Sequence, residues 1–539
     1  MASLRQMNVP RPTAGDVIAG ISVALVLIPQ SLAYAEIAGV PPYVGLFAAA
    51  LPPLLAAPLM SSPYLQTGPV ALTSLLTFGA LSGLAATGSP DYVELAALLA
   101  LIVGVTRFIL GLFRMGTLAY LMSQPVLQGF TSAAAILIVS SQLPSMFATD
   151  PDSEGVLPRA WDTLTSPGDW SGSALLLTAL TIAVVLGSRR VHKLFPGVLV
   201  MVIGATVWSE ITDYGGPKVG ELPNQFLSLS LDLPYDQAAD LILPGIVIAL
   251  VGFAEPASIS RTFATLDRIP WSANRELISS GVANMTSAIS GAFPVGGSFS
   301  RSSLNRFAGA TSNWSGAVTG VVVIAALPLA SNLEPLPRAV LGAIVFTAVY
   351  RLIQPMPIIR MWRQSAPQAA IATGTFVATL LFSPNVERGV LLGVALAIGF
   401  HLYREMRVAH SVELDDGTLL FRPSGVVWFA STPALEDAFR EAVAAHPDAT
   451  RMVIDLDQCG RLDYSGASTL TDLINDVSDG EADGVIDPEK AGTFDVAVIN
   501  IPDHAARSLS VFLGGTHGVP EIDDLPADVR WQWVAPWRR

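Results

Sequence analysis

The sequence predicts an α-helical membrane protein that crosses the bilayer many times and ends in a soluble α/β domain. Of its 539 residues, 51% are hydrophobic and only 14% are charged, whereas soluble globular proteins carry about a quarter charged residues. The charge also divides the chain. Residues 1–410 hold 21 Lys and Arg against 21 Asp and Glu, and residues 411–539 hold 9 against 23. We therefore expect a transmembrane domain over 1–410 and a soluble domain over 411–539.

Composition also excludes several classes of protein. A net charge of −14 without a basic stripe disfavours nucleic-acid binding. A single cysteine, Cys459, excludes a disulfide scaffold, and with only six scattered histidines no metal site is expected. The first apolar run, 17–37, is long enough to span a bilayer, so we expect no cleavable signal peptide.

Fourteen apolar segments are predicted to span the membrane, seven in each half of the domain. Basic loops, such as the one holding Arg261, Arg268 and Arg275, follow the even-numbered segments, and acidic loops follow odd-numbered ones. The positive-inside rule then puts both termini in the cytoplasm. We expect the membrane to be a plasma membrane, the inner membrane of a bacterium. The segments are 17–37, 42–60, 65–86, 93–113, 119–143, 172–187 and 194–211, then 240–259, 276–293, 297–310, 315–331, 337–350, 367–383 and 387–403.

Two of these segments are interrupted at corresponding positions of the two halves. Residues 61–70 and 293–301 both combine Pro and Gly with Ser, Thr or Arg and run into short apolar helices. Free backbone groups at membrane depth survive only inside protein or beside a wet cavity. Paired interruptions indicate an inverted-repeat transporter whose half-helix N-termini point at one place, an arrangement that suits an anion. The alternative is a pair of kinked helices.

Polar side chains inside the apolar segments are candidates for function. Glu255 lies within the eighth segment and must be protonated, paired or facing water. It is therefore a candidate proton carrier or, alternatively, the structural partner of an arginine. Arg301 is the only strong positive charge that we place near the middle of the membrane. Gln30 and Tyr34 lie one turn apart and either bind a ligand or pack between helices.

Several motifs resemble the sulfate permease family, which is also called solute carrier family twenty-six. They are the stretch from Gly15 to Ala35, which contains the run LIPQSLAYA, the Ala38–Pro42 run, the Gly68–Ala71 break and the segment 293–302. This resemblance implies a seven-plus-seven inverted repeat with core and gate domains, a homodimer, and a cytoplasmic STAS domain at the C-terminal end.

The resemblance also implies an anion site and a coupling residue. Glu255 corresponds to the carboxylate of proton-coupled members, and the following Arg261–Ala264 resembles plant sulfate transporters. Tyr34 departs from the family pattern, in which many members have Phe. The implied anion-binding residues are Gln30, Tyr34, Gly68, Val70, Ser298, Ser300 and Arg301.

The soluble domain is predicted to alternate strands with helices. The loop that ends at Gly466 resembles the STAS loop, which implies a phosphorylatable, regulatory Ser465, although Ser465 or Asp463 can instead cap the next helix. Residues 479–489 read as a flexible acidic loop, and the glycine-rich 514–518 has no Walker lysine. The predicted strands are 419–429, 451–456 and 494–501, and the predicted helices are 433–445, 468–477 and 503–512.

These observations together predict a secondary active anion transporter and not an enzyme, because no nucleophile–base pair can be placed. The favoured activity is proton-coupled uptake of sulfate or a similar oxyanion by alternating access. The alternatives are sodium-coupled bicarbonate transport, proton-coupled dicarboxylate transport, and an anion exchanger or channel. No cofactor is expected beyond the coupling ion, H⁺ or Na⁺. The expected partners are a small anion, the lipid bilayer, a second copy and a regulatory protein at the STAS domain.

Overall fold

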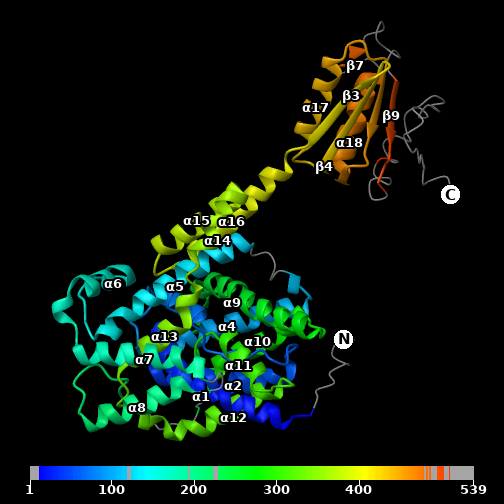
Figure 1. Cartoon of the computed structure of the whole chain (residues 1–539). Helices are drawn as coiled ribbons and strands as arrows, with labels where there is room; N and C mark the ends of the chain where they lie inside the picture. The colour runs from blue at the N-terminus through cyan, green and yellow to red at the C-terminus, as the bar shows by residue number, and fades with distance from the viewer. Residues whose placement is uncertain are drawn as a thin grey trace. The chain divides into compact units, whose positions relative to one another are not determined.

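The chain forms two compact units in a computed structural model, residues 1–397 and 398–539 (Figure 1). Each unit has its own hydrophobic core. The division falls inside a helix, and the first strand of the second unit begins at Ala409. The residues that the structure describes are 11–117, 123–191, 195–222, 227, 229–478, 481–482, 485–486, 495–502 and 509.

Each predicted span overlaps one α-helix of the structure. The first half contains α1 (Ala14–Ala38), α2 (Pro42–Ala56), α3 (Ala71–Leu81), α4 (Pro90–Leu112), α5 (Gln124–Phe147), α7 (Gly172–Val191) and α8 (Gly197–Ile211). The second half contains α9 (Ala238–Asp267), α10 (Ala273–Ile289), α11 (Phe299–Phe307), α12 (Trp314–Ala326), α13 (Arg338–Val349), α15 (Ala366–Leu381) and α16 (Val386–Glu405).

Two further helices were not predicted. α6 (Val156–Thr165) lies between the fifth and sixth spans of the first half, and α14 (Pro355–Gln364) lies at the same place in the second half. Both are short and amphipathic. A search for spanning segments finds neither because each mixes apolar with charged side chains.

Length and composition identify only part of the membrane domain. Within the described residues, eight helical segments are long and apolar enough to cross a membrane, and α3, α7, α8 and α15 are shorter apolar helices. α10 is too polar for either class, since it buries Glu276 and Asn284 among its side chains, and α11 has only nine residues. α10 packs closely against α4, so protein rather than lipid surrounds its polar groups.

The interrupted segments of the two halves meet as a short antiparallel pair of strands. β1 (Thr67–Gly68) pairs with β2 (Gly296–Gly297), with Thr67 opposite Gly297 and Gly68 opposite Gly296. α3 begins three residues after β1, and α11 begins two residues after β2. The interruptions are therefore extended segments that lead into half-helices, and the alternative of two kinked helices is wrong.

The start of α1 is joined to the second half by a buried carboxylate. Asp16 completes a capping box with Thr13. The same carboxylate accepts hydrogen bonds from the backbone N–H groups of Thr311 and Ser312, each at 2.8 Å. The first turn of α1 is thus fixed to the loop between α11 and α12.

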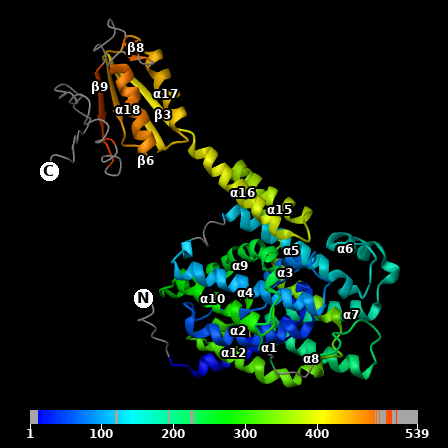
Figure 2. The ribbon, with the colours of Figure 1, turned by 180° about the vertical axis from the view of Figure 1, so that it is seen from behind.

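The second unit is an α/β layer with a mixed sheet (Figure 2). β3 (Ala409–Asp415) is antiparallel to β4 (Thr418–Val427), whereas β5 (Arg451–Asp455), β6 (Cys459–Leu462) and β9 (Asp495–Ile499) run parallel to their neighbours. The helices are α17 (Thr432–Ala445) and α18 (Tyr464–Ser478). The three predicted strands are confirmed. β3 and β6 were not predicted, since most of the side chains of β3 are exposed and show no apolar alternation.

Two predictions for this unit need correction or fall outside the described residues. α18 begins four residues before the predicted start at 468, because the Asp463 carboxylate caps its first turn. The acidic insertion contains a small hairpin of β7 (Glu481–Ala482) and β8 (Val485–Ile486) where only a loop was expected. The predicted helix 503–512, apart from Leu509, and the glycine-rich 514–518 lie outside the described residues.

Candidate functional site

The centre of the candidate site is Arg301 in the first turn of α11. Ser298 precedes this helix as its N-cap, and the Ser298 hydroxyl accepts a hydrogen bond from the Arg301 backbone N–H at 3.5 Å. The Arg301 side chain is 1% exposed, and its Nη1 donates to Gln30 Oε1 at 3.4 Å. Its Nε and Nη2 have no hydrogen-bond partner among the described residues. Buried guanidinium donors are normally paired, so two free ones indicate a place for an anionic ligand.

Residues of the first half surround this guanidinium. Gln30 and Tyr34 lie on α1, and both are buried, at 6% and 5% exposure. Tyr34 interacts electrostatically with Arg301. Gly68 lies in β1, where a Cβ atom would stand 3.6 Å from Arg301 Nη2. Val70 is the N-cap residue of α3, so the unpaired N–H groups of this helix begin at the same place.

The two predicted serines differ in their surroundings. Ser298 is 8% exposed, and its backbone N–H donates to the carbonyl oxygen of Gln66 at 3.1 Å. Ser300 is exposed, although its hydroxyl lies 3.2 Å from that of Ser298. Ser300 therefore belongs to the rim of the candidate site and Ser298 to its interior.

Glu255 is brought to the same helix end. It lies on α9, is half-buried, and accepts a hydrogen bond from the backbone N–H of Phe299 in the first turn of α11. It also interacts electrostatically with Arg301. A carboxylate and a guanidinium therefore share the N-terminal end of one half-helix. The carboxylate partly offsets the arginine's charge, and the helix dipole favours negative charge at this end.

A second buried arginine, which the sequence reasoning missed, stabilises the backbone beside the β1–β2 strand pair. Arg107 of α4 is completely buried and donates to the carbonyl oxygens of Ala249, Ile248 and Val295 and to the Ser280 hydroxyl, at 2.9 to 3.2 Å. The expectation that Arg301 is the only strong positive charge near the middle of the membrane is therefore wrong. The sequence does contain a signal for Arg107, because an arginine inside the apolar segment 93–113 is unusual.

The loop before β2 is also held by an amide side chain. Asn284 of α10 accepts from the Val295 backbone N–H at 2.9 Å and donates to the Val295 carbonyl oxygen at 3.1 Å. Together with Arg107, it satisfies the backbone at the residue that precedes the strand pair. These contacts position the start of α11 without touching the free Arg301 donors.

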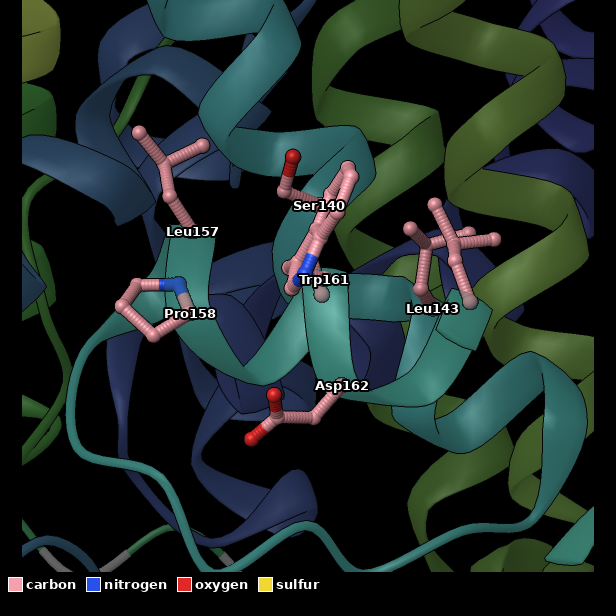
Figure 3. A pocket seen from close by; sticks show the side chains of 8 residues that line it. Ser140, Leu143, Leu157, Pro158, Trp161 and Asp162 are labelled. Atoms are coloured by element: carbon pink, nitrogen blue, oxygen red, sulfur yellow. The ribbon is translucent and has the colours of Figure 1, made fainter. Parts of the chain in front are cut away.

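A cavity of about 580 Å³ lies elsewhere, between α5 and α6. Figure 3 shows the side chains around it, which include Ser140 and Leu143 from α5 and Trp161 and Asp162 from α6. None of the predicted site residues lines this cavity. Its lining is mostly apolar and carries no basic side chain, so it offers no anion site.

In the second unit, Ser465 lies in the first turn of α18 and is half-buried. The capping contact comes from Asp463, whose carboxylate accepts from the Gly466 backbone N–H at 2.9 Å. Of the two candidates for capping α18, the structure therefore favours Asp463. The Ser465 hydroxyl is not needed as the cap of this helix.

Comparison with known proteins connects this geometry to a family. Residues 14–375 match the sulfate permease family, and residues 409–485 match the STAS domain. The chain belongs to the sulfate permease family. This assignment confirms the resemblance seen in the sequence motifs, and the two matched regions together include every predicted site residue. A member of this family is a multi-pass membrane protein that transports anions and is not an enzyme.

The chain is similar to sulfate transporters from plants and bacteria. It is 31% identical over 475 residues to the chloroplastic sulfate transporter 4.1 of Arabidopsis thaliana, an alignment that covers 82% of this chain and 69% of the relative. It is 34% identical over 416 residues to a probable sulfate transporter of Mycobacterium tuberculosis, with 76% and 72% covered.

Solved structures share the fold. The murine anion transporter solute carrier 26 family member A9, in its inward-facing state, matches with a TM-score of 0.82 at 20% identity and covers 95% of this chain and 89% of its own. The transmembrane domain of the cyanobacterial bicarbonate transporter BicA matches with a TM-score of 0.59 at 22% identity, over 72% and 97%. The predicted fold class, a helical membrane domain followed by a STAS domain, is confirmed.

Proposed function

We propose that this sulfate permease family member takes up sulfate, or a similar oxyanion, together with protons by alternating access. The observation that carries the proposal is the buried Arg301 guanidinium, which has two free donors where the half-helices α3 and α11 begin. The relatives from Arabidopsis and Mycobacterium are named as a sulfate transporter and a probable sulfate transporter, which supports sulfate as the anion.

The anion binds between the N-terminal ends of α3 and α11. Arg301 Nε and Nη2 donate to its oxygens, and the helix dipoles add partial positive charge. Gln30 orients the guanidinium through its hydrogen bond to Nη1. Gly68 keeps side-chain atoms away from Nη2, and the Ser298, Ser300 and Tyr34 hydroxyls provide further donors.

Glu255 couples the proton to the anion. While it is ionised, Glu255 offsets the charge of Arg301 and occupies the Phe299 backbone N–H. A proton on Glu255 removes that competition, so the arginine and the helix end become available to a dianion. Proton binding and anion binding therefore favour each other, which is the linkage that symport requires.

The wider arrangement is part of the same proposal. The protein is a homodimer in a plasma membrane, with the chain termini and the STAS domain in the cytoplasm. The STAS domain binds a regulatory partner, and phosphorylation of Ser465 would add negative charge at the N-terminal end of α18. Core and gate parts of the membrane domain move relative to each other to expose Arg301 to one side at a time.

Uptake into liposomes tests the coupling. Full-length protein in sodium-free proteoliposomes is given labelled sulfate with an acidic exterior, and uptake is compared with vesicles that have no proton gradient. We expect accumulation driven by the gradient in the native chain. Glu255→Gln should abolish the gradient dependence, and Glu94→Gln, an exposed glutamate on α4, serves as the matched control and should leave it intact.

The alternative outcomes of the uptake experiment would support different activities. Uptake of bicarbonate only when sodium is added would indicate sodium-coupled bicarbonate transport, and gradient-driven uptake of a dicarboxylate in place of sulfate would change the substrate. Flux in Glu255→Gln that equals the native flux and ignores the gradient would indicate an exchanger or channel. In that case Glu255 would be a structural partner of Arg301.

A further inference from the structure

The amphipathic helix α14 presents an apolar stripe to its surroundings. Met356, Ile359 and Trp362 are 54%, 51% and 52% exposed. At 100° per residue they lie within about 120° of one another on the helix surface. The opposite side, with Pro357, Ile358 and Met361, is partly buried. Solvent-exposed apolar stripes of this kind mark an interaction surface.

Arginines stand on the same exposed side. Arg360 and Arg363 are exposed and alternate with the apolar side chains, since Arg363 lies one turn after Ile359 and Arg360 one turn after Met356. Among the described residues, no carboxylate forms an ion pair with either arginine. The face therefore combines apolar side chains with positive charge that no carboxylate in the described part of the chain neutralises.

The location of α14 limits what can cover this face. The helix joins α13 to α15, two apolar helices of the membrane domain. The residues just before α14 form hydrogen bonds with α5. There the Ser132 hydroxyl donates to the Leu352 carbonyl oxygen at 3.4 Å, and Gln128 Nε2 donates to Gln354 Oε1 at 3.2 Å. α14 ends the helical segment Arg338–Gln364 that begins with α13. Its Trp and Arg side chains are of the kinds that are favoured at the boundary between hydrocarbon and water.

The corresponding helix of the first half provides a contrast. α6, which is labelled in Figure 1, also exposes apolar side chains, with Trp161 at 67% and Leu164 at 48%. Figure 3 labels Trp161 among the side chains of this helix. Its single arginine, Arg159, is paired with Asp150 at 3.2 Å, and Asp162 also lies on the helix. The two amphipathic helices thus occupy equivalent places in the two halves, yet only α14 carries unpaired positive charge.

We propose that the exposed face of α14 binds anionic phospholipids of the bilayer. Met356, Ile359 and Trp362 enter the acyl-chain boundary, and Arg360 and Arg363 contact phosphate groups. Charge complementarity favours this occupant over a zwitterionic lipid, because each basic residue near an anionic membrane surface strengthens binding about fivefold. α6 has no such preference, since its arginine is already neutralised.

Native mass spectrometry of the detergent-solubilised full chain tests this proposal. The protein is titrated with short-chain phosphatidylglycerol and, separately, with phosphatidylcholine. We expect Arg360→Gln combined with Arg363→Gln to weaken phosphatidylglycerol binding about 25-fold, the product of two fivefold effects, and to leave phosphatidylcholine binding unchanged. Replacing both arginines with lysine should retain most of the affinity, and added salt should weaken binding by the native chain only.

Arg159→Gln on α6 is the matched control and should leave phosphatidylglycerol binding unchanged. Equal loss in this control would mean that only the total charge matters, which would overturn a site on α14. Unchanged phosphatidylglycerol binding in the α14 double variant would also overturn it. The same spectra also report the oligomeric mass. If the native chain is a dimer and the α14 double variant is a monomer with either lipid, a second copy covers this face instead of lipid.

Discussion

Arg107 and Arg301 are both fully enclosed, yet they have opposite hydrogen-bonding states. Arg107 makes four hydrogen bonds, three of them to backbone carbonyl oxygens. Arg301 donates one side-chain hydrogen bond, to Gln30, and its Nε and Nη2 have no hydrogen-bond partner among the described residues. A buried charge without partners costs free energy in the empty protein. Arg107 is therefore satisfied within the protein, whereas the proposed function leaves the remaining Arg301 donors to an anion.

This difference predicts opposite effects of the same substitution. Arg301→Gln should weaken sulfate binding by roughly 10- to 100-fold, since charge-assisted hydrogen bonds contribute about 1.5–3 kcal/mol. It should not lower the melting temperature of the empty protein. Arg107→Gln should destabilise the protein by at least about 3 kcal/mol. Binding is measured by titration with labelled sulfate and stability by thermal unfolding in detergent.

The exposed arginine on the same helix is the control for binding. Arg306 of α11 pairs with Asp267 on the surface, and Arg306→Gln should leave sulfate affinity unchanged. A melting temperature that fell equally in Arg301→Gln and Arg107→Gln would contradict the assignment of Arg301 to the ligand.

At the scale of elements, the pair β1 and β2 determines where the two half-helices meet. Its residues are all buried, and the two strands approach closely because Gly296 and Gly297 have no side chains. A Cβ on Gly296 would lie 2.9 Å from Val70 Cγ2, which is closer than two carbon atoms can pack without a shift. Gly68 has φ +152, a conformation that L side chains rarely adopt.

A compensating pair of substitutions tests the close packing of β1 against β2. Gly296→Ala should destabilise the protein by about 1–3 kcal/mol and reduce sulfate uptake, because the new methyl group pushes against Val70. Adding Val70→Ala removes that methyl contact and should recover part of both losses. Thermal unfolding and uptake by the two single variants and the double variant measure the coupling. Simple addition of the two losses would contradict the close packing of the strands.

For the whole molecule, the two units have separate hydrophobic cores. The core of the second unit includes Phe421 and Phe439 together with residues from β5, α18 and β9, and its described members all lie beyond residue 407. A core of this kind can support a domain of ordinary size without the membrane unit.

Residues 405–539 should therefore fold when produced alone. We expect cooperative thermal unfolding by circular dichroism. Phe439→Ala, at a side chain that is 1% exposed, should destabilise this fragment by about 3–5 kcal/mol, whereas Phe429→Ala, at a side chain that is 66% exposed, should have little effect. A fragment without a cooperative transition would show that the second unit needs the first.

The sequence was sufficient for those features whose cause is local. Apolar runs of spanning length predict the helices, Pro and Gly at membrane depth predict the interruptions, and the change in charge near residue 410 marks the soluble part. The candidate residues Gln30, Glu255 and Arg301 were singled out for the same reason. A polar side chain inside an apolar run is conspicuous by its immediate neighbours.

Only the tertiary structure decided which of these polar groups are satisfied. Arg107 and Arg301 look alike in the sequence, but Arg107 meets carbonyl oxygens about 140 residues away, and no local pattern encodes that packing. The register of β1 with β2 and the unpaired charge on α14 likewise depend on which distant segments come together. Local sequence determines which helices and strands form. The packing of distant segments determines which hydrogen-bond donors remain unpaired and which helix faces remain exposed.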